Sequence, residues 1–469
     1  MRGLRHILPL VAASLMLLLW GCSGKKNGDT ATDTAQWKAE SHPLPDTLRV
    51  ATLYSPSSYF LFRDEEMGYD YSLVKLFASD KGMALDLTVA PSLAAMVELL
   101  DSGKVDLLAY EVPVTAEYRR RTVPCGPETF THQVLVQPRK GGEGFITDET
   151  QLVGRDVYVE AHSKYLYRMQ NLNEELGGGV NIQVIDRDTI MAEDLIEMVS
   201  EGEVPLTVVD SDIARVNKTY YPDLDISLPL SFPQRSQWAV ARGRSWLADS
   251  VNGWLAQESP RKRNAELLKR YFELSKNTEP YVVNIDFSKG VISPYDAYFR
   301  RYASAYGQDW RMLAAQGYVE SHFRNDLVSW AGARGIMQLM PVAMRGYGLT
   351  DATVTDPELN IEAAAKIMRD IDRSLSKYVS DPVERRKFSI AAYNSGIGHI
   401  YDAIALAGKH GKDPALWEGN VETALMWKSN PEYYTDPVCR NGYFRGRQTV
   451  EYVRKVLDFY ARASARIPS

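Results

Sequence analysis

The sequence predicts a multi-domain protein: a two-lobed α/β domain at residues 46–273 is followed by a mainly α-helical domain at 280–469. Strand-like and helix-like segments alternate in the first half, which is typical of α/β folds with a largely parallel sheet. From about Pro280 onward helical patterns dominate, and glycine and proline separate them. The 469 residues are enough for two or three domains, each with its own core.

The first half contains two successive sets of alternating elements, separated by a glycine-rich break at 141–144. The first set is a strand at 48–53, a helix at 71–81, a strand at 84–90, a helix at 93–102 and a strand at 105–109. The second set has strands at 156–159, 206–209 and 238–241 and a helix at 246–271. Two α/β lobes joined by crossing strands predict a clamshell with a cleft between the lobes.

The second half shows helical periodicity and no strand-like alternation of comparable strength. Helices are expected at 295–306, 310–320, 335–345, 361–378, 384–394, 397–407 and 449–463.

The N-terminus has the features of a secreted lipoprotein. Arg2 and Arg5 precede an apolar run at 7–20, which is too short for a comfortable membrane span and suits a signal peptide. Gly21-Cys22 resembles a bacterial lipobox, which implies a signal peptide at 1–21, a lipid-modified Cys22 and a flexible tether at 22–45. Ser23 stands where an aspartate retains many such proteins at the inner membrane, so we expect the periplasmic side of the outer membrane. An ordinary N-terminal membrane anchor is the alternative.

Composition excludes several classes of function. The net charge of −6 and the absence of a basic run longer than three residues argue against nucleic-acid binding. Three cysteines provide no disulfide framework. His322, His399 and His410 lack the spacing of a zinc motif, so no metal and no cofactor is expected. The sequence contains no G-x-S-x-G motif, so no serine nucleophile is indicated.

Glu320 is the candidate catalytic acid. It ends a predicted helix whose buried side carries Met312, Leu313 and Gln316, so its carboxyl group is expected at a partly apolar edge. Desolvation there would raise its pKa and keep the proton available for a glycosidic oxygen. The alternative is a helix-end carboxylate in a salt bridge with Arg324.

Four motifs follow one another in a fixed order, and together they are far more specific than any one of them. They are Glu320-Ser321, Gly335-Ile336-Met337-Gln338, Ala391-Ala392-Tyr393-Asn394-Ser395-Gly396, and Tyr452 within Thr449-Val450-Glu451-Tyr452-Val453. This series resembles the catalytic domain of the soluble-lytic-transglycosylase family over about residues 290–465. The resemblance implies a lysozyme-like helical fold. It also implies a groove for peptidoglycan strands of alternating N-acetylglucosamine and N-acetylmuramic acid.

The resemblance also implies a mechanism. Glu320 would protonate the leaving oxygen and then accept the proton of the muramic acid's own C6 hydroxyl, which attacks C1 and leaves a 1,6-anhydro sugar. An intramolecular nucleophile needs no second carboxylate to activate water. Asp326 is the nearest such carboxylate, and it fits a loop or cap position better. A hydrolase like goose-type lysozyme is the alternative.

The remaining motif residues are candidates for binding substrate, and each also has a structural interpretation. Ser321 and Gln338 carry groups suited to sugar hydroxyls and amides, although Ser321 can equally be a helix-end hydroxyl. Met337 suits packing beside the groove, and Asn394 can also cap a helix. The full set is Ser321, Met337, Gln338, Tyr393, Asn394 and Tyr452. Tyr452 can alternatively be a core aromatic whose hydroxyl reaches the surface.

The first half carries a looser resemblance, to the periplasmic solute-binding domains (family 3) of amino-acid transport systems. It rests on 103–109 followed by Thr115-Ala116-Glu117-Tyr118-Arg119, and on Asp210 after a strand. The resemblance implies that Arg119 clamps a ligand carboxylate and that Asp210 holds an ammonium group. The ligand would be an amino acid or a muropeptide. A surface arginine and a strand-end aspartate are the alternatives.

A solute-binding module behind a lipid anchor and before a transglycosylase domain resembles the membrane-bound lytic transglycosylase F family. This arrangement implies that the first domain is a sensor that biases the catalytic groove when its cleft closes. A lipid-anchored solute receptor with a degenerate catalytic half is the competing hypothesis, and the intact motif series argues against it.

Overall fold

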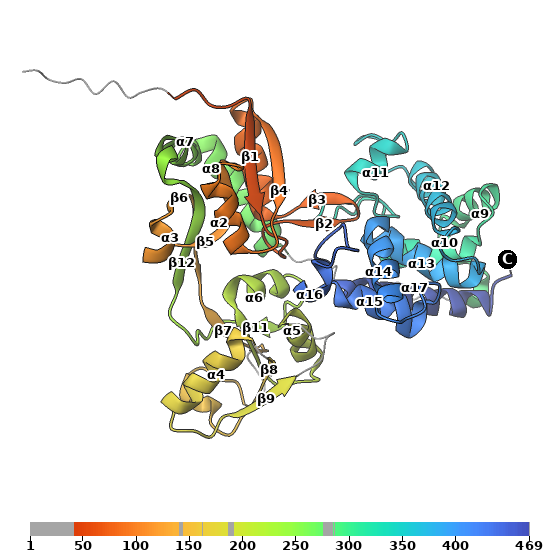
Figure 1. The fold of residues 1–469 in the computed structure, drawn as a ribbon. Helices are drawn as coiled ribbons and strands as arrows, with labels where there is room; N and C mark the ends of the chain where they lie inside the picture. Colours follow the sequence, from red (N-terminus) through yellow and green to blue (C-terminus); the bar gives the residue numbers. More distant parts are fainter. Residues whose placement is uncertain are drawn as a thin grey trace, which may run out of the picture. The chain divides into compact units, whose positions relative to one another are not determined.

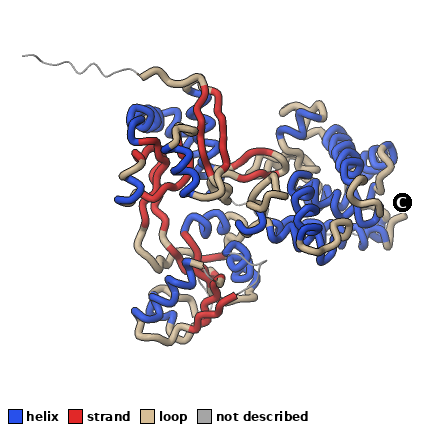
Figure 2. The backbone as a smooth tube through the Cα atoms, viewed as in Figure 1, coloured by secondary structure: helices blue, strands red, loops and turns tan. Residues whose placement is uncertain are grey.

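The computed structural model describes residues 42–139, 144–161, 163–185, 192–274, 285 and 287–468 (Figure 1). The predicted signal peptide, Cys22 and most of the tether therefore lie outside the described residues. Strands belong to the N-terminal half and helices dominate the C-terminal half (Figure 2). This confirms the predicted fold class, a two-lobed α/β region followed by a mainly α-helical domain. None of the described helices has both the length and the apolar character needed to cross a bilayer.

The first lobe is built on a five-stranded sheet in the order β4-β1-β5-β12-β6. Its strands are β1 (Thr47–Thr52), β4 (Ala84–Val89), β5 (Leu107–Pro113), β6 (Thr122–Thr131) and β12 (Gln234–Ala241). β1 is parallel to β4 and β5, whereas β12 is antiparallel to both of its neighbours. The accompanying helices are α1 (Tyr69–Asp80), α2 (Leu93–Asp101), α3 (Ala116–Arg119), α7 (Ser245–Leu255) and α8 (Glu258–Phe272).

The helix predicted at 246–271 is in fact two helices, α7 and α8. The chain leaves helical geometry at Gln257, whose φ of −69° and ψ of 152° are extended. Pro260 then falls in the first turn of α8, where its missing N–H has no intrahelical partner to lose. Both helices pack on the first lobe through Leu247, Val251 and Tyr271.

The second lobe has its own five-stranded sheet, in the order β11-β7-β10-β8-β9. Its elements are β7 (Gln133–Pro138), β8 (Asp156–Glu160), α4 (Lys164–Glu175), β9 (Asn181–Ile185), α5 (Ala192–Glu201), β10 (Thr207–Asp210), α6 (Ser211–Lys218) and β11 (Leu224–Asp225). Only His132 separates β6 of the first sheet from β7 of the second, and the chain returns from β11 to β12. These two passages are the predicted crossing strands.

A small hairpin, β2 (Phe60–Phe62) with β3 (Glu65–Met67), interrupts the first lobe and was not predicted. Its two-residue turn consists of Arg63 and Asp64, with φ of 50° and 62°. Positive φ at both positions is the geometry of a type I′ turn, which Asn-Gly usually supplies. Side chains with a Cβ pay roughly 1–2 kcal/mol per residue for left-handed backbone. Residues held there point to a functional constraint.

The helical domain surrounds a single large apolar cluster that includes Phe299, Ile336, Phe388 and Val456. Its helices are α9 (Asp296–Ala305), α10 (Trp310–Ser321), α11 (Pro341–Gly346), α12 (Pro357–Leu375), α13 (Pro382–Ser395), α14 (Ile397–Lys409), α15 (Glu422–Trp427), α16 (Pro431–Tyr434) and α17 (Gly446–Ser464). Aspartate side chains accept backbone N–H groups at the starts of α10, α12 and α13. These caps fix where each helix begins.

The helix predicted at 335–345 is wrong over its first half. Gly335 and Gln338 have φ of 79° and 47°, which a right-handed helix cannot contain, and α11 starts only at Pro341. Asn360 holds this loop: its Oδ1 accepts the Met337 N–H at 2.8 Å, and its Nδ2 donates to the Arg334 carbonyl at 3.2 Å. A Cβ at Gly335 would lie 2.4 Å from Asn360 Nδ2, so this position requires glycine.

Candidate active site

Glu320 lies in the last turn of α10. His322 and Phe323 follow with φ of 52° and 65°, and this left-handed geometry ends the helix. The predicted inward side of α10 is buried at Met312, Leu313 and Gln316. The Glu320 side chain is only 4% exposed.

Two side chains reach the Glu320 carboxylate. The Tyr452 hydroxyl, from α17, donates to Oε1 at 2.8 Å. Arg63, from the hairpin turn, donates from Nη2 to Oε1 at 3.1 Å and to Oε2 at 3.0 Å. Burial and then the Glu320 charge raise the pKa of Tyr452 well above its usual value, so this phenol stays protonated and acts as a donor.

The alternative partner for Glu320, Arg324, lies elsewhere. Arg324 instead faces Asp326 at 4.0 Å on the surface. The Asp326 side chain is 83% exposed, in contrast to 4% for Glu320. An exposed loop carboxylate is a poor partner for a buried catalytic acid, because water screens it.

The loop beside Glu320 is held by the predicted substrate-binding residues. The Ser321 hydroxyl donates to the Ile336 carbonyl at 2.7 Å, and the Tyr393 hydroxyl donates to the Met337 carbonyl at 2.7 Å. Gln338 donates from Nε2 to the carbonyls of Gly335 and Leu327, at 2.9 and 3.1 Å. The motif residues thus fix the shape of the 335–338 loop next to the acid.

Asn394 and Met337 stabilise the fold around the site and do not contact the Glu320 carboxylate in any hydrogen bond of the described residues. The Met337 side chain is fully buried. Asn394 accepts the Thr449 hydroxyl at 2.7 Å, which ties α13 to α17. The residue that caps α13 is Gly396, so Asn394 does not cap the helix.

The β2–β3 hairpin reaches the candidate site at Glu320, and the sequence did not predict this contact. Besides Glu320, Arg63 donates from Nη1 to the Gln338 carbonyl at 2.9 Å. Burial alone would lower the pKa of Arg63, but the Glu320 charge, the Tyr452 and Tyr393 phenols and the hydrogen bond to Glu320 together outweigh it. The pKa is therefore raised and the guanidinium stays charged. Arg63 and Tyr452 together donate to both oxygens of the Glu320 carboxylate and cover it. The described arrangement is therefore occluded.

The flanks of the hairpin dock on the starts of two catalytic-domain helices. The Asp64 carboxylate accepts the N–H groups of Ile397 and Gly398, at 3.2 and 3.4 Å, where α14 begins. Glu65 accepts the Val342 N–H at 2.6 Å, where α11 begins. Acidic groups are stabilised at helix N-termini by the free N–H groups and the helix dipole. His399 lies 3.2 Å from the Leu61 carbonyl and adds a fourth contact.

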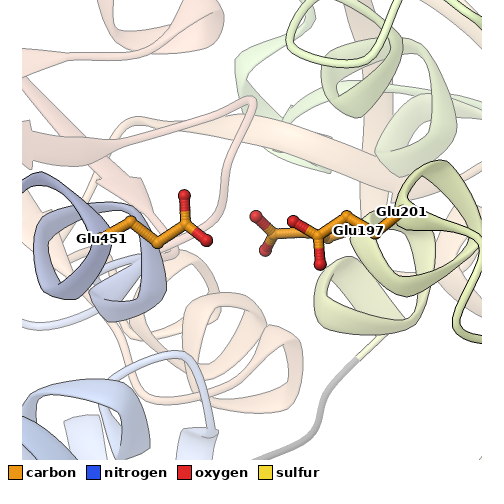
Figure 3. A group of neighbouring side chains, drawn as sticks. All are labelled: Glu197, Glu201 and Glu451. Carbon is orange, nitrogen blue, oxygen red and sulfur yellow. The ribbon is translucent and has the colours of Figure 1, made fainter. Parts of the chain in front are cut away.

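The three histidines that were considered as metal ligands lie against separate aromatic groups. His322 packs on Tyr318, and His399 stacks on Phe444. His410 contacts Trp427. In the described part of the chain, carboxylates of Glu197, Glu201 and Glu451 converge within 4.8 Å of one another, from α5 and α17 (Figure 3). Arg447 lies 3.4 Å from Glu197 and offsets part of this charge.

The two cysteines in the described ranges are poor candidates for a nucleophile. Cys125 is buried and Cys439 is half-buried, and both are free thiols. Burial raises the pKa of each to about 12, so the reactive thiolate is scarce at neutral pH.

The predicted sensor residues are not joined in this arrangement. Arg119 is exposed at the end of α3. Asp210 precedes α6 and forms an ion pair with Lys164. Within the described ranges, no hydrogen bond or ion pair links Arg119 to Asp210.

Carboxylates from both lobes meet near the crossing strand instead. Thr131 donates to Glu111 of β5 at 3.4 Å, and the next residue, His132, accepts the Ser211 N–H at 2.8 Å, beside Asp212 of α6. Burial and then the Asp212 charge raise the pKa of Glu111 to about 8. Burial and then the Asp210 charge raise the pKa of Asp212 to about 6.

This acidic pair predicts a pH-dependent stability. Between about pH 4.5 and 8, Glu111 keeps its proton in the folded protein but loses it in the unfolded chain. The free energy of unfolding therefore falls as the pH rises through that window. Glu111→Gln should flatten the fall by up to about 1 kcal/mol per pH unit. Urea unfolding at a series of pH values measures the slope, with Glu98→Gln, an exposed site on α2, as the control. An unchanged slope in Glu111→Gln would contradict the shift.

Two family models match the chain in sequence order. Residues 48–274 match the bacterial extracellular solute-binding proteins, family 3. Residues 297–416 match the transglycosylase SLT domain, which includes Glu320, Gln338 and Asn394. A solved structure of the Lactococcus lactis GlnP substrate-binding domain 2 is 17% identical, with a TM-score of 0.41, and covers 50% of this chain and 97% of its own.

The fold and the two matches define a solute-binding module joined to a transglycosylase domain. A membrane-bound lytic murein transglycosylase F from Pseudomonas fluorescens is 30% identical over 462 residues, which span 97% of this chain and 90% of the relative. One from Desulfosudis oleivorans is 30% identical over 427 residues, 90% of each chain. The chain belongs to the membrane-bound lytic murein transglycosylase F family.

Proposed function

We propose that this chain is a peptidoglycan lytic transglycosylase in which Glu320 is the acid and then the base. The observation that carries the proposal is the buried carboxylate of Glu320, a residue of the region that matches the transglycosylase domain, with the Tyr452 hydroxyl of α17 donating to its Oε1. The substrate is the glycan strand, cut at the β-1,4 bond from N-acetylmuramic acid to N-acetylglucosamine.

The reaction is balanced by Glu320 alone. Its carboxylic acid gives a proton to the bridging oxygen as the bond from that oxygen to C1 breaks. The resulting carboxylate then takes the proton of the C6 hydroxyl as the C6 oxygen bonds to C1. One glycosidic bond is exchanged for one 1,6-anhydro bond, and no water is consumed. The C6 hydroxyl belongs to the substrate itself, so it reaches C1 without the entropic cost of bringing in a water.

Product mass distinguishes this proposal from hydrolysis. Purified peptidoglycan digested with the protein should release 1,6-anhydromuropeptides, each lighter by one water than the products of a lysozyme. Reducing-end muropeptides would instead favour the goose-type-lysozyme-like hydrolase.

We propose further that ligand binding between the two N-terminal lobes regulates access to Glu320. The support is that the hairpin which covers the acid belongs to the first lobe. The ligand class is an amino acid or a muropeptide, held by Arg119 and Asp210. The ammonium group of the ligand replaces Lys164 as the partner of Asp210. Binding to the folded state must raise its melting temperature. Calorimetry of the protein with amino acids and stem-peptide fragments tests this, and a lack of binding would leave the module as a spacer.

We propose that Cys22 carries the lipid anchor and that the protein faces the periplasm from the outer membrane. The support is the lipobox-like Gly21-Cys22 and the membrane-bound relatives. Cys22→Ala should block processing, so the precursor keeps its signal peptide. Mass spectrometry of the wild-type N-terminus decides: an unlipidated mature protein in the membrane fraction would contradict the anchor.

A further inference from the structure

A cavity of about 560 Å³, part of it open to solvent, lies where the hairpin, α6 and the start of α17 meet. About 50 Å³ of it admits the centre of a water-sized group, several times the roughly 10–15 Å³ that one buried water needs, so part of a small ligand can enter. Its walls are largely apolar, from Phe60, Leu61, Phe62, Val216 and Phe444. Arg445, Gln448 and Thr449 supply polar groups along one side.

Arg445 is the charged residue in this wall, and its hydrogen bonding is incomplete. The guanidinium carbon lies 4.8 Å from the centre of the Tyr220 ring. Nη1 is buried and has no hydrogen-bond partner. The nearby Glu193 carboxylate accepts the Tyr443 hydroxyl at 2.8 Å, so part of its capacity is used. A buried guanidinium donor without an acceptor is unfavourable, and a bound anion would satisfy it.

The segment that leads to Arg445 is firmly held, so the guanidinium is positioned in advance. Asp402 accepts the N–H groups of Arg440 and Asn441, at 3.0 and 2.9 Å, and forms a buried ion pair with Lys428. The Phe444 N–H donates to the Lys428 carbonyl at 2.9 Å. A site whose donor is already fixed loses little entropy when a ligand binds.

We propose that this cavity is a regulatory site for a small amphipathic carboxylate. The carboxylate accepts from Arg445 Nη1, and the apolar part lies against Phe60, Phe62 and Phe444. A carboxylate fits better than a neutral acceptor because charge-assisted hydrogen bonds to guanidinium are the stronger ones. The site differs from the amino-acid site proposed between the lobes, because its walls include the catalytic domain.

A ligand in this cavity favours one arrangement of the domains, because the cavity walls come from both of them. The hairpin, α6 and α17 must stay together for the cavity to exist, so a ligand that fills it stabilises that arrangement. The same arrangement places Arg63 on Glu320. An occupant of this cavity therefore holds the enzyme in the occluded state and acts as an inhibitor.

The test uses the full chain in detergent and three carboxylates: phenylacetate, N-acetyl-L-phenylalanine and octanoate. Each is compared with its own primary amide, which has nearly the same shape and no charge. At least one carboxylate should raise the melting temperature and slow amide hydrogen exchange at residues 60–67. Its amide should bind at least tenfold more weakly. If none of the three binds, or if the amides bind equally well, the proposal is overturned.

Two variants locate the binding. Arg445→Met removes the donor, and Val216→Phe fills the cavity without touching a charge; each should weaken carboxylate binding at least tenfold. Arg454→Met, at an exposed arginine of α17, the helix that directly follows Arg445, is the matched control and should bind as the wild type does. If Arg445→Met does not fold, Val216→Phe decides alone. Unchanged binding in Val216→Phe would place the carboxylate elsewhere and overturn the proposal.

Discussion

Glu320→Gln should lower the turnover of peptidoglycan at least as much as general acid/base catalysis usually contributes, about 10²–10⁴-fold. Glutamine has nearly the same size, but it can neither donate the leaving-group proton nor take one from the C6 hydroxyl. The Tyr452 hydroxyl can still donate to the glutamine oxygen, so the local geometry should be preserved. Release of soluble muropeptides from purified peptidoglycan, followed by chromatography, measures the loss.

The matched control is Asp326→Asn. Its carboxylate is 83% exposed, and the proposed mechanism requires no activated water. The rate should therefore stay within about twofold of the wild type. If Asp326→Asn is as damaging as Glu320→Gln and the products carry reducing ends, the enzyme is a two-carboxylate hydrolase.

Arg63→Ala raises the activity of the ligand-free protein by about 10- to 100-fold. The occluded state loses charge-assisted hydrogen bonds to Glu320, which typically contribute about 1.5–3 kcal/mol. The substitution also leaves the Glu320 carboxylate buried without a cation, which further disfavours occlusion. About 1.4 kcal/mol shifts a two-state equilibrium tenfold, so the open population rises accordingly until it predominates. Initial rates on purified peptidoglycan, without added ligand, measure the effect.

Arg324→Ala controls for the loss of a positive charge near the site, because this arginine is partly exposed and pairs with Asp326. Its activity should remain at the wild-type level. The double variant Arg63→Ala, Glu320→Gln should be inactive. This result would show that the gain in Arg63→Ala comes from the uncovered Glu320 and not from a new activity. A wild-type or lower rate in Arg63→Ala would mean that substrate enters with the hairpin in place.

The sequence predicted the fold class and the candidate acid, because both depend on local patterns. Alternating strands and helices predicted the α/β half, and helical periodicity predicted the domain that follows. The order of four short motifs singled out Glu320 and Tyr452, which the structure brings to 2.8 Å. The helix that carries Glu320 was predicted because its apolar face and its polar end are both visible in 310–321.

Other features depend on contacts between distant residues, which no local pattern contains. The 335–338 segment looks helical by composition, but Asn360 supplies the hydrogen bonds that hold it as a loop. The hairpin has three-residue strands and a turn of Arg63 and Asp64 without glycine or asparagine, so it carries no local hairpin signal. It contacts the starts of α11 and α14 and the Glu320 carboxylate, 257 residues away from Arg63. The sequence by itself determined the fold class and pointed to Glu320 as the candidate acid. Only the tertiary structure decided that Arg63 of the first lobe pairs with Glu320, because that ion pair forms between residues of different domains.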